Sequence, residues 1–169
     1  MKRILMLGLI FLGMVSFSNL QATELPNPTG RVILTVTGAI SNTNTAGGAA
    51  VFDRQMLVDL GMTSLKTGTP WSEGVDLYEG PLLRSLINAV GANTDTLSIT
   101  ALNDYGALVP VKDSFDYDVI LAIDMNGEAM RIRDKGPIFV LYPFDTDPNL
   151  SNEVIYNRSV WQIKAISVE

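Results

Sequence analysis

The 169-residue sequence contains no cysteine and no histidine. The first absence excludes disulfides, iron–sulfur clusters and a thiol nucleophile, and the second excludes a Ser-His-Asp triad and histidine-based metal sites. Histidine is also the usual side chain for acid–base chemistry near neutral pH. Carboxylate, lysine and tyrosine chemistry stay open, so the sequence leaves enzymatic activity undecided, with a protein lacking it as the favoured hypothesis.

Positive charge is scarce as well. Lysine and arginine total 12 against 18 aspartates and glutamates, which gives a formal net charge of −6. No segment carries a stripe of basic residues, so nucleic acid and anionic membranes are poor partners for this chain. Hydrophobic residues make up 47% of the sequence, which is enough for an ordered domain with its own core.

The amino terminus shows the three parts of a secretory signal. Lys2 and Arg3 precede an apolar run over residues 4–17, and small and polar residues follow up to Ala22. The apolar run is shorter than the roughly 18 residues expected of a membrane-spanning helix. We predict cleavage after Ala22, with cleavage after Ser18 as the alternative.

These features predict a signal peptide over residues 1–22 and one domain over residues 23–169. Export of a chain without cysteine indicates the periplasm of a Gram-negative bacterium, with no membrane insertion after cleavage.

Hydrophobic periodicity predicts an α+β domain in which strands predominate. One helix follows a capping Asp53 and ends at Gly61, and a second spans residues 81–90 with Pro81 at its first position. Residues 75–79 are predicted as an edge or surface strand. The nine predicted strands span residues 31–38, 62–69, 75–79, 96–102, 107–111, 119–124, 128–133, 138–142 and 160–168.

Residues 145–153 form a polar segment with oxygen-bearing side chains at alternate positions, as in the first part of a calcium loop. Leu150, however, stands where the sharp turn needs glycine, and Tyr156 stands where the bidentate glutamate belongs. We therefore predict a solvated loop, and no metal ligand.

Three cations, Arg131, Arg133 and Lys135, lie within five positions of this acidic chain. The strand predicted there puts Arg131 and Arg133 on one face. Together with Arg158 they could bind a carboxylate, phosphate or sulfate. The alternative is that they pair with internal carboxylates, for which the candidates are Asp104, Asp124 and Asp134.

Most aromatic residues of the carboxyl-terminal half are expected in the core. Trp71 differs, because it lies in a segment rich in glycine, proline and serine. It is the aromatic residue expected to be partly exposed, and so a candidate wall of a pocket.

Several short motifs occur in a defined order along the chain. They are Thr37-Gly38, Thr69-Pro70-Trp71, the segment YEGPLLRSL at residues 78–86, ALNDY at 101–105, Val109-Pro110, RIRDKGP at 131–137, Tyr142-Pro143 and RSVWQ at 158–162. In this order the chain resembles the oxidoreductase molybdopterin-binding domain family, with the sulfite-oxidase-type fold, in a short standalone secreted form.

The resemblance implies a mixed α+β fold of mostly β sheets around a barrel-like core. It also implies that catalytic members bind molybdenum through a cysteine thiolate, with arginines and a histidine holding the pterin. This chain lacks both cysteine and histidine. Ser64 or Thr67 could offer a hard oxygen in place of the thiolate, without its softness. No metal ligand or catalytic residue is carried over.

The favoured hypothesis is a periplasmic, non-catalytic binding module that recognises a small anionic or aromatic ligand, or the periplasmic domain of a membrane sensor. No cofactor is expected. The candidate ligand-binding residues are Trp71, Asn103, Asp104, Tyr105, Arg131, Arg133 and Arg158. One alternative is a molybdopterin-dependent oxidoreductase, or a subunit of one, that holds its cofactor without cysteine. The other is a structural or interaction protein that pairs through an edge strand such as residues 75–79.

Overall fold

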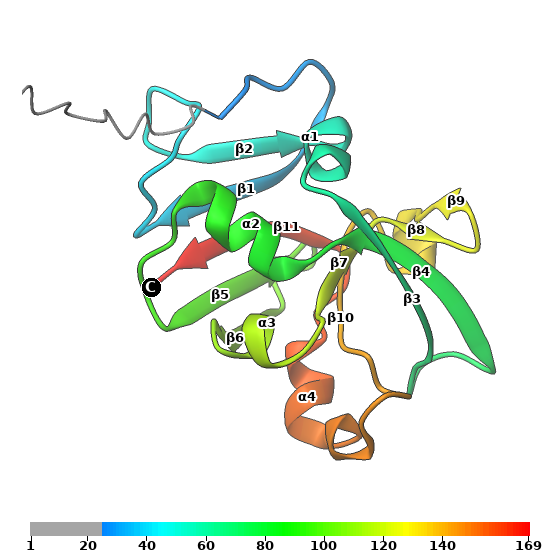
Figure 1. The fold of residues 1–169 in the computed structure, drawn as a ribbon. Coiled ribbons are helices and arrows are strands. Elements are labelled where there is room, and N and C mark those ends of the chain that lie inside the picture. Colours follow the sequence, from blue (N-terminus) through cyan, green and yellow to red (C-terminus); the bar gives the residue numbers. More distant parts are fainter. Residues whose placement is uncertain (1–24) are drawn as a thin grey trace, which may run out of the picture.

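The computed structural model describes residues 25–169, so the predicted signal peptide lies outside the described residues. The described residues form a mixed α and β fold in which strands predominate, as predicted, and they surround a hydrophobic core (Figure 1). Within this range no helix has the length and apolar character needed to cross a membrane.

The largest sheet has five strands in the order β2-β1-β11-β5-β6. Strands β1 and β11 pair in parallel, and the other neighbours are antiparallel. Alternate side chains of each strand face the core, among them Leu34 and Val36 of β1. The strands span Val32–Gly38 (β1), Ala50–Asp53 (β2), Thr96–Ala101 (β5), Gly106–Pro110 (β6) and Ile163–Val168 (β11).

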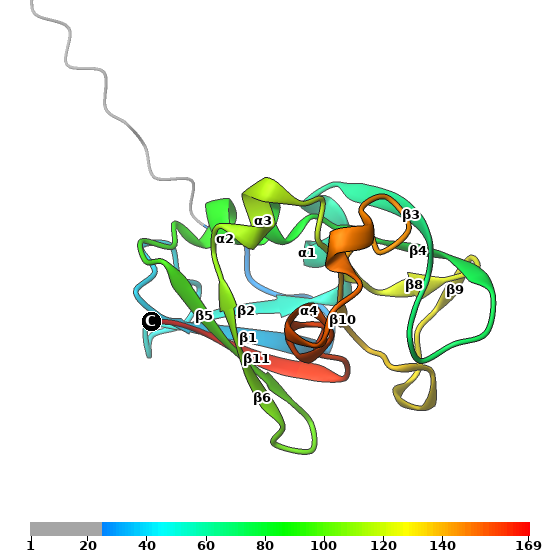
Figure 2. The same cartoon turned by 90° about the horizontal axis from the view of Figure 1, so that it is seen from below.

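Helices α1 (Arg54–Asp59) and α2 (Leu83–Val90) lie on the same side of this sheet (Figure 2). The carboxylate of Asp53 caps α1, as predicted, by accepting a hydrogen bond from the backbone N–H of Met56 at 2.9 Å. Pro81 was predicted to begin the second helix, which is wrong. It ends strand β4, and the helix starts at Leu83 because Leu82 still has an extended backbone.

A second sheet has four strands in the order β3-β4-β8-β9. They span Met62–Gly68 (β3), Val75–Pro81 (β4), Asp124–Met125 (β8) and Glu128–Ala129 (β9). Of the two alternatives predicted for residues 75–79, the edge strand is wrong, because β4 pairs with β3 along its whole length and with β8 at Tyr78 and Glu79. The surface strand is confirmed at Val75 and Leu77, whose side chains are exposed.

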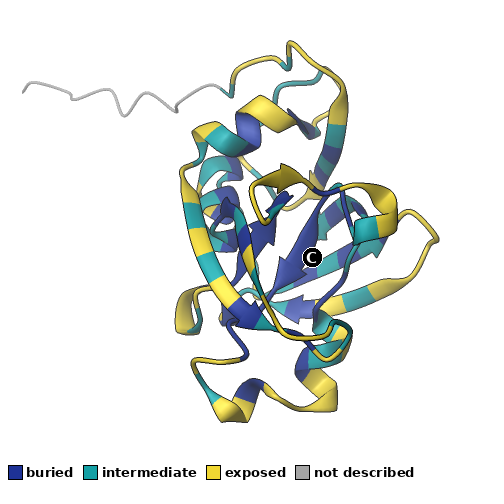
Figure 3. Ribbon diagram, turned by 90° about the vertical axis from the view of Figure 1, so that its right-hand side faces the viewer, coloured by how far each residue is buried: buried dark blue, intermediate teal, exposed yellow. Residues whose placement is uncertain are grey.

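Two short buried strands, β7 (Ile120–Ala122) and β10 (Phe139–Leu141), lie between these sheets. A bridge from Phe139 to Trp161 connects β10 to the segment before β11, and a bridge from Leu82 to Ile120 connects β7 to the end of β4. The three sheets are thus linked around one core, whose residues are buried while the periphery is exposed (Figure 3).

Strand β4 crosses β7 at very close range. A Cβ atom on Gly80 would lie 1.9 Å from the carbonyl oxygen of Leu121, so only glycine fits at this position.

Four helical segments were not predicted. They are α3 (Asp113–Asp116), the 3-10 helices η1 (Ile132–Asp134) and η2 (Pro148–Leu150), and α4 (Glu153–Arg158). The predicted strand over residues 128–133 is therefore wrong beyond Ala129. Arg131 and Arg133 do not share a strand face.

Candidate functional site

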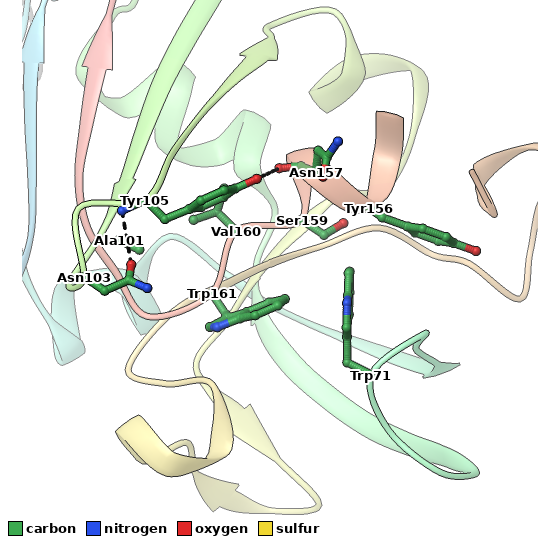
Figure 4. A pocket seen from close by; sticks show the side chains of 9 residues that line it. All are labelled: Trp71, Ala101, Asn103, Tyr105, Tyr156, Asn157, Ser159, Val160 and Trp161. Atoms are coloured by element: carbon green, nitrogen blue, oxygen red, sulfur yellow. Dashed lines mark hydrogen bonds between the residues drawn. The ribbon is translucent and has the colours of Figure 1, made fainter. Parts of the chain in front are cut away.

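A cavity of about 270 Å³ opens between the β5–β6 turn, the end of α4 and the loop after β3 (Figure 4). Its walls contain aromatic and small side chains, and among residues 25–169 no charged side chain lines it. The lining residues are Trp71, Ala101, Asn103, Tyr105, Tyr156, Asn157, Ser159, Val160 and Trp161.

The loop between β3 and β4 positions Trp71 at the cavity wall. The hydroxyl of Thr69, itself buried, lies 2.7 Å from the hydroxyl of Ser72 and accepts a hydrogen bond from the backbone N–H of Trp71 at 3.3 Å. The backbone N–H of Ser72 donates to the carbonyl of Thr69 at 3.3 Å. These bonds form a tight turn that holds the indole partly exposed, as predicted for this tryptophan.

Aromatic rings support Trp71 from several directions, all edge to face. Its ring centroid lies 5.1 Å from that of Trp161 and 5.8 Å from that of Tyr156. The buried rings of Phe139 and Phe144 lie 6.1 and 6.2 Å away. Such contacts fix ring orientation, so this wall is formed in advance of any ligand.

The opposite side of the cavity is polar but uncharged. The hydroxyl of Tyr105 donates a hydrogen bond to the carbonyl of Asn157 at 3.2 Å, which joins the β5–β6 turn to the end of α4 (Figure 4). The amide oxygen of Asn103 accepts from the backbone N–H of Tyr105 at 3.1 Å, and the hydroxyl of Ser159 donates to the carbonyl of Ile155 at 2.8 Å.

The structure brings three of the seven predicted binding residues together, namely Trp71, Asn103 and Tyr105. Asp104 belongs to the same turn but does not line the cavity. Its carboxylate accepts a hydrogen bond from the ammonium of Lys164 at 2.5 Å, and this contact holds the pKa of Asp104 below its ordinary value.

Arg158 also lies outside the cavity lining. Its guanidinium donates to the carboxylate of Asp113 at 2.9 Å, and the same oxygen accepts from the hydroxyl of Tyr142 at 2.7 Å. Burial and the neighbouring Asp113 raise the pKa of Tyr142. Arg158 therefore pairs with an internal carboxylate and fastens α4 to α3.

Arg131 and Arg133 lie in a separate hollow and flank Ile132 at η1. Both pair with Asp134, at Nε–Oδ distances of 3.2 and 3.7 Å. The prediction that Arg131, Arg133 and Arg158 share one anion site with Trp71 is wrong. Arg131 and Arg133 lie at a 3-10 helix instead of on one strand face, and Arg158 pairs with Asp113.

Four polar or aromatic residues of the cavity lining were not predicted from the sequence, namely Tyr156, Asn157, Ser159 and Trp161. They lie on α4 and just after it, in a region predicted to contain a loop and then a strand. A signal was present in Asn152, whose side chain caps α4 by accepting from the N–H groups of Val154 and Ile155 at 2.9 and 3.1 Å.

Comparison with known protein families gives a match over most of the domain. Residues 53–144, more than half of the chain, match the model of the family described as oxidoreductase molybdopterin binding domain. No curated protein matches the sequence.

The residues present do not fit a complete molybdenum–pterin cofactor. The chain has no cysteine or histidine, and no three acidic side chains converge as a metal site among residues 25–169. The hydroxyl of Thr67 donates to the carbonyl of Gly68 and accepts from the N–H of Asp145, while Ser64 bonds Glu79 from the opposite face of β3. The two oxygens cannot converge on one metal, and the aromatic cavity presents no cation to a phosphate.

Proposed function

The chain belongs to the oxidoreductase molybdopterin binding domain family, and we propose that it uses this domain as a non-catalytic module that binds a small, planar aromatic molecule. One observation carries this proposal. The cavity beside Trp71 is walled by four aromatic side chains, and no charged group of the described part of the chain lines it; the four are Trp71, Tyr105, Tyr156 and Trp161.

A planar ligand suits this cavity for two physical reasons. Flat rings bury apolar area against indole and phenol rings that are already held in place, so little conformational entropy is lost on binding. Polar groups at the rim can then fix the orientation of the ligand. Within residues 25–169 the Nδ2 amide group of Asn103 makes no hydrogen bond, so it can donate to a heteroatom of the bound ring.

The sequence predicts a small anionic or aromatic ligand, and this cavity supports the aromatic one. The three arginines predicted to hold an anion lie elsewhere, with Arg158 committed to Asp113 and Arg131 and Arg133 to a separate hollow. We therefore assign the cavity to an uncharged aromatic ligand.

The test is a fluorescence titration, because both tryptophans of the sequence line the cavity. Quinoline and pterin serve as planar probes, with benzoate as the anionic probe and cyclohexanol as the non-aromatic one. We expect saturable quenching by the planar probes and no saturation with cyclohexanol. Binding of benzoate as tight as that of quinoline would contradict the assignment to an uncharged ligand.

Tyr105→Ala is the informative variant, because it removes one wall and keeps both tryptophan reporters. Stacking of a base on one aromatic side chain is worth about 1–3 kcal/mol, so we expect the affinity for quinoline to fall about 5- to 150-fold. Phe115→Ala is the matched control, since this phenylalanine is 54% exposed and lies outside the cavity. Equal affinities of both variants, or no saturation with any planar probe, would refute the binding function.

We also propose that the mature protein works in the periplasm, on the basis of the predicted signal at residues 1–22. Amino-terminal sequencing of the protein from a periplasmic fraction should show Thr23 as the first residue, or Asn19 if the alternative cleavage site is used. Recovery of the intact chain from the cytoplasm would contradict this location.

A further inference from the structure

A second hollow, of about 640 Å³, lies at one end of the large sheet, on residues that the aromatic cavity does not use. Its walls come from the start of β1, the end of β5, the start of β11 and the segment that carries η1. Four cations line it, namely Arg31, Arg131, Arg133 and Lys164.

These cations are only partly neutralised. Arg131 and Arg133 share the single carboxylate of Asp134, and their side chains are 62% and 70% exposed. The ammonium of Lys164 pairs with Asp104 at 2.5 Å. Within residues 25–169 Arg31 has no ion-pair partner, and no acidic side chain lines the hollow. The hollow is therefore locally positive on a chain whose net charge is −6.

Apolar side chains are exposed among the same cations. Val32, Leu102 and Ile132 line the hollow and are 41%, 44% and 60% exposed. Ile132 lies directly between Arg131 and Arg133 in the sequence, so an apolar contact and two charges are presented together.

Hydrogen bonds from Gln162 hold the backbone of the segment that carries Arg131, Ile132 and Arg133. The side-chain amide of Gln162 donates to the carbonyl of Ile132 at 2.7 Å, and the backbone N–H of Gln162 donates to the carbonyl of Lys135 at 3.0 Å. A Cβ atom on Gly136 would lie 2.1 Å from the carbonyl oxygen of Met130, so the backbone closes tightly beneath η1. The surface is preorganised, which lowers the entropic cost of binding.

From these observations we propose that the basic hollow docks an acidic segment of a partner protein, anchored by an apolar side chain against Ile132. Carboxylates flanking that anchor match the guanidinium groups in charge and geometry. An anionic membrane fits less well than a peptide. A membrane surface would face a wide area of this negatively charged chain, and not the positive hollow alone. A free inorganic anion would leave the three exposed apolar side chains uncovered.

The test uses fluorescence anisotropy with a fluorescein-labelled peptide in which glutamates flank a Leu-Phe pair. Two control peptides replace the glutamates with glutamine or the Leu-Phe pair with serine. We expect saturable binding of the first peptide, at least tenfold weaker binding of each control, and weakening with added salt.

The double variant Arg131→Glu/Arg133→Glu should lower the affinity for the acidic peptide at least tenfold, and Ile132→Ser should also lower it. Lys66→Glu/Lys112→Glu is the matched control, because it changes the net charge equally with residues outside the hollow. All substituted side chains, including that of Ile132, are solvent-accessible, and circular dichroism verifies folding of each variant.

Two results would overturn the proposal. The first is no saturable binding of the acidic peptide, and the second is an equal loss of affinity in both double variants. In the first case, binding to vesicles containing phosphatidylglycerol, or self-association in sedimentation velocity, that Arg131→Glu/Arg133→Glu abolishes would identify a membrane or a second copy of the chain as the occupant instead. None of these results bears on the aromatic cavity, which the quinoline titration tests separately.

Discussion

The indole rings of Trp71 and Trp161 lie edge to face with their centroids 5.1 Å apart, although 90 positions separate the two residues in the sequence. Because the chain has no other tryptophan, this contact predicts coupled indole bands in circular dichroism. We expect either Trp71→Phe or Trp161→Phe to abolish the coupled bands, while Tyr105→Phe leaves them unchanged. Bands that simply halve in each single variant would show that the rings do not interact.

The network of Tyr142, Asp113 and Arg158 predicts a graded loss of stability. Tyr142→Phe removes one buried hydrogen bond and should lower the free energy of unfolding by about 1–2 kcal/mol. Arg158→Ala leaves the carboxylate of Asp113 buried without its cation and should cost more, about 2–4 kcal/mol. Urea unfolding measures both values.

Arg133→Ala is the control for this network, because its side chain is 70% exposed. It should change the free energy of unfolding by less than about 0.5 kcal/mol. Equal losses for Arg158→Ala and Arg133→Ala would contradict a structural role for the Asp113 pair.

Asp53 predicts a specific loss of stability in acid. Its carboxylate accepts from the backbone N–H groups of Met56, Gly30 and Thr29 at 2.7 to 2.9 Å, and these bonds hold its pKa below the ordinary value of 3.8. A lowered pKa in the folded state stabilises the fold above that ordinary value. This contribution is lost as the pH falls below it and through the folded-state pKa.

The measurement is the melting temperature of Asp53→Asn across the acid range. At pH 7 the variant should melt below the wild type. The difference should shrink as the pH falls below 3.8 and through the lowered pKa of the folded state, because the wild-type carboxyl group becomes neutral over that range. Asp95→Asn is the control, since Asp95 is exposed and its side chain makes no hydrogen bond within residues 25–169. A difference that grows in acid would contradict a lowered pKa of Asp53 in the folded state.

The crossing of β4 and β7 predicts that Gly80 tolerates no side chain. A Cβ atom there would overlap the carbonyl of Leu121, so Gly80→Ala should cost more than about 3 kcal/mol or prevent folding. At Gly47 a Cβ atom would meet nothing within 4 Å and the backbone φ is not positive. Gly47→Ala should therefore fold normally, and comparable yields of the two soluble variants would refute the close crossing.

Local sequence patterns predicted the elements that are locally determined. The capping aspartate at Asp53, the alternating strand at residues 31–38 and the apolar run at residues 138–142 each carry their own signal, and each lies within one residue or two of the observed element. The order of short motifs also identified the family, which the match over residues 53–144 confirms. The predicted α+β class is confirmed with it.

The candidate site could be predicted only in part, because it depends on contacts between distant segments. Trp71 stood out by its local composition, whereas Tyr156 and Trp161 resemble core residues until α4 is seen to carry them to the cavity. The predicted placement of Arg131 and Arg133 on one strand face is wrong for a different reason. Their i, i+2 spacing fits a strand, but the tight backbone at Gly136 and the bonds from Gln162 hold the segment as a 3-10 helix.

The short link made by Gln162 has a practical consequence for measuring this protein. Its two hydrogen bonds reach the carbonyls of Ile132 in η1 and of Lys135 directly after η1, and the residue before it, Trp161, forms one wall of the aromatic cavity. The residue that bonds Ile132 is therefore the direct sequence neighbour of Trp161. We therefore expect that tryptophan fluorescence of the unlabelled protein can be tried as a readout for peptide binding at η1 as well as for planar molecules in the cavity.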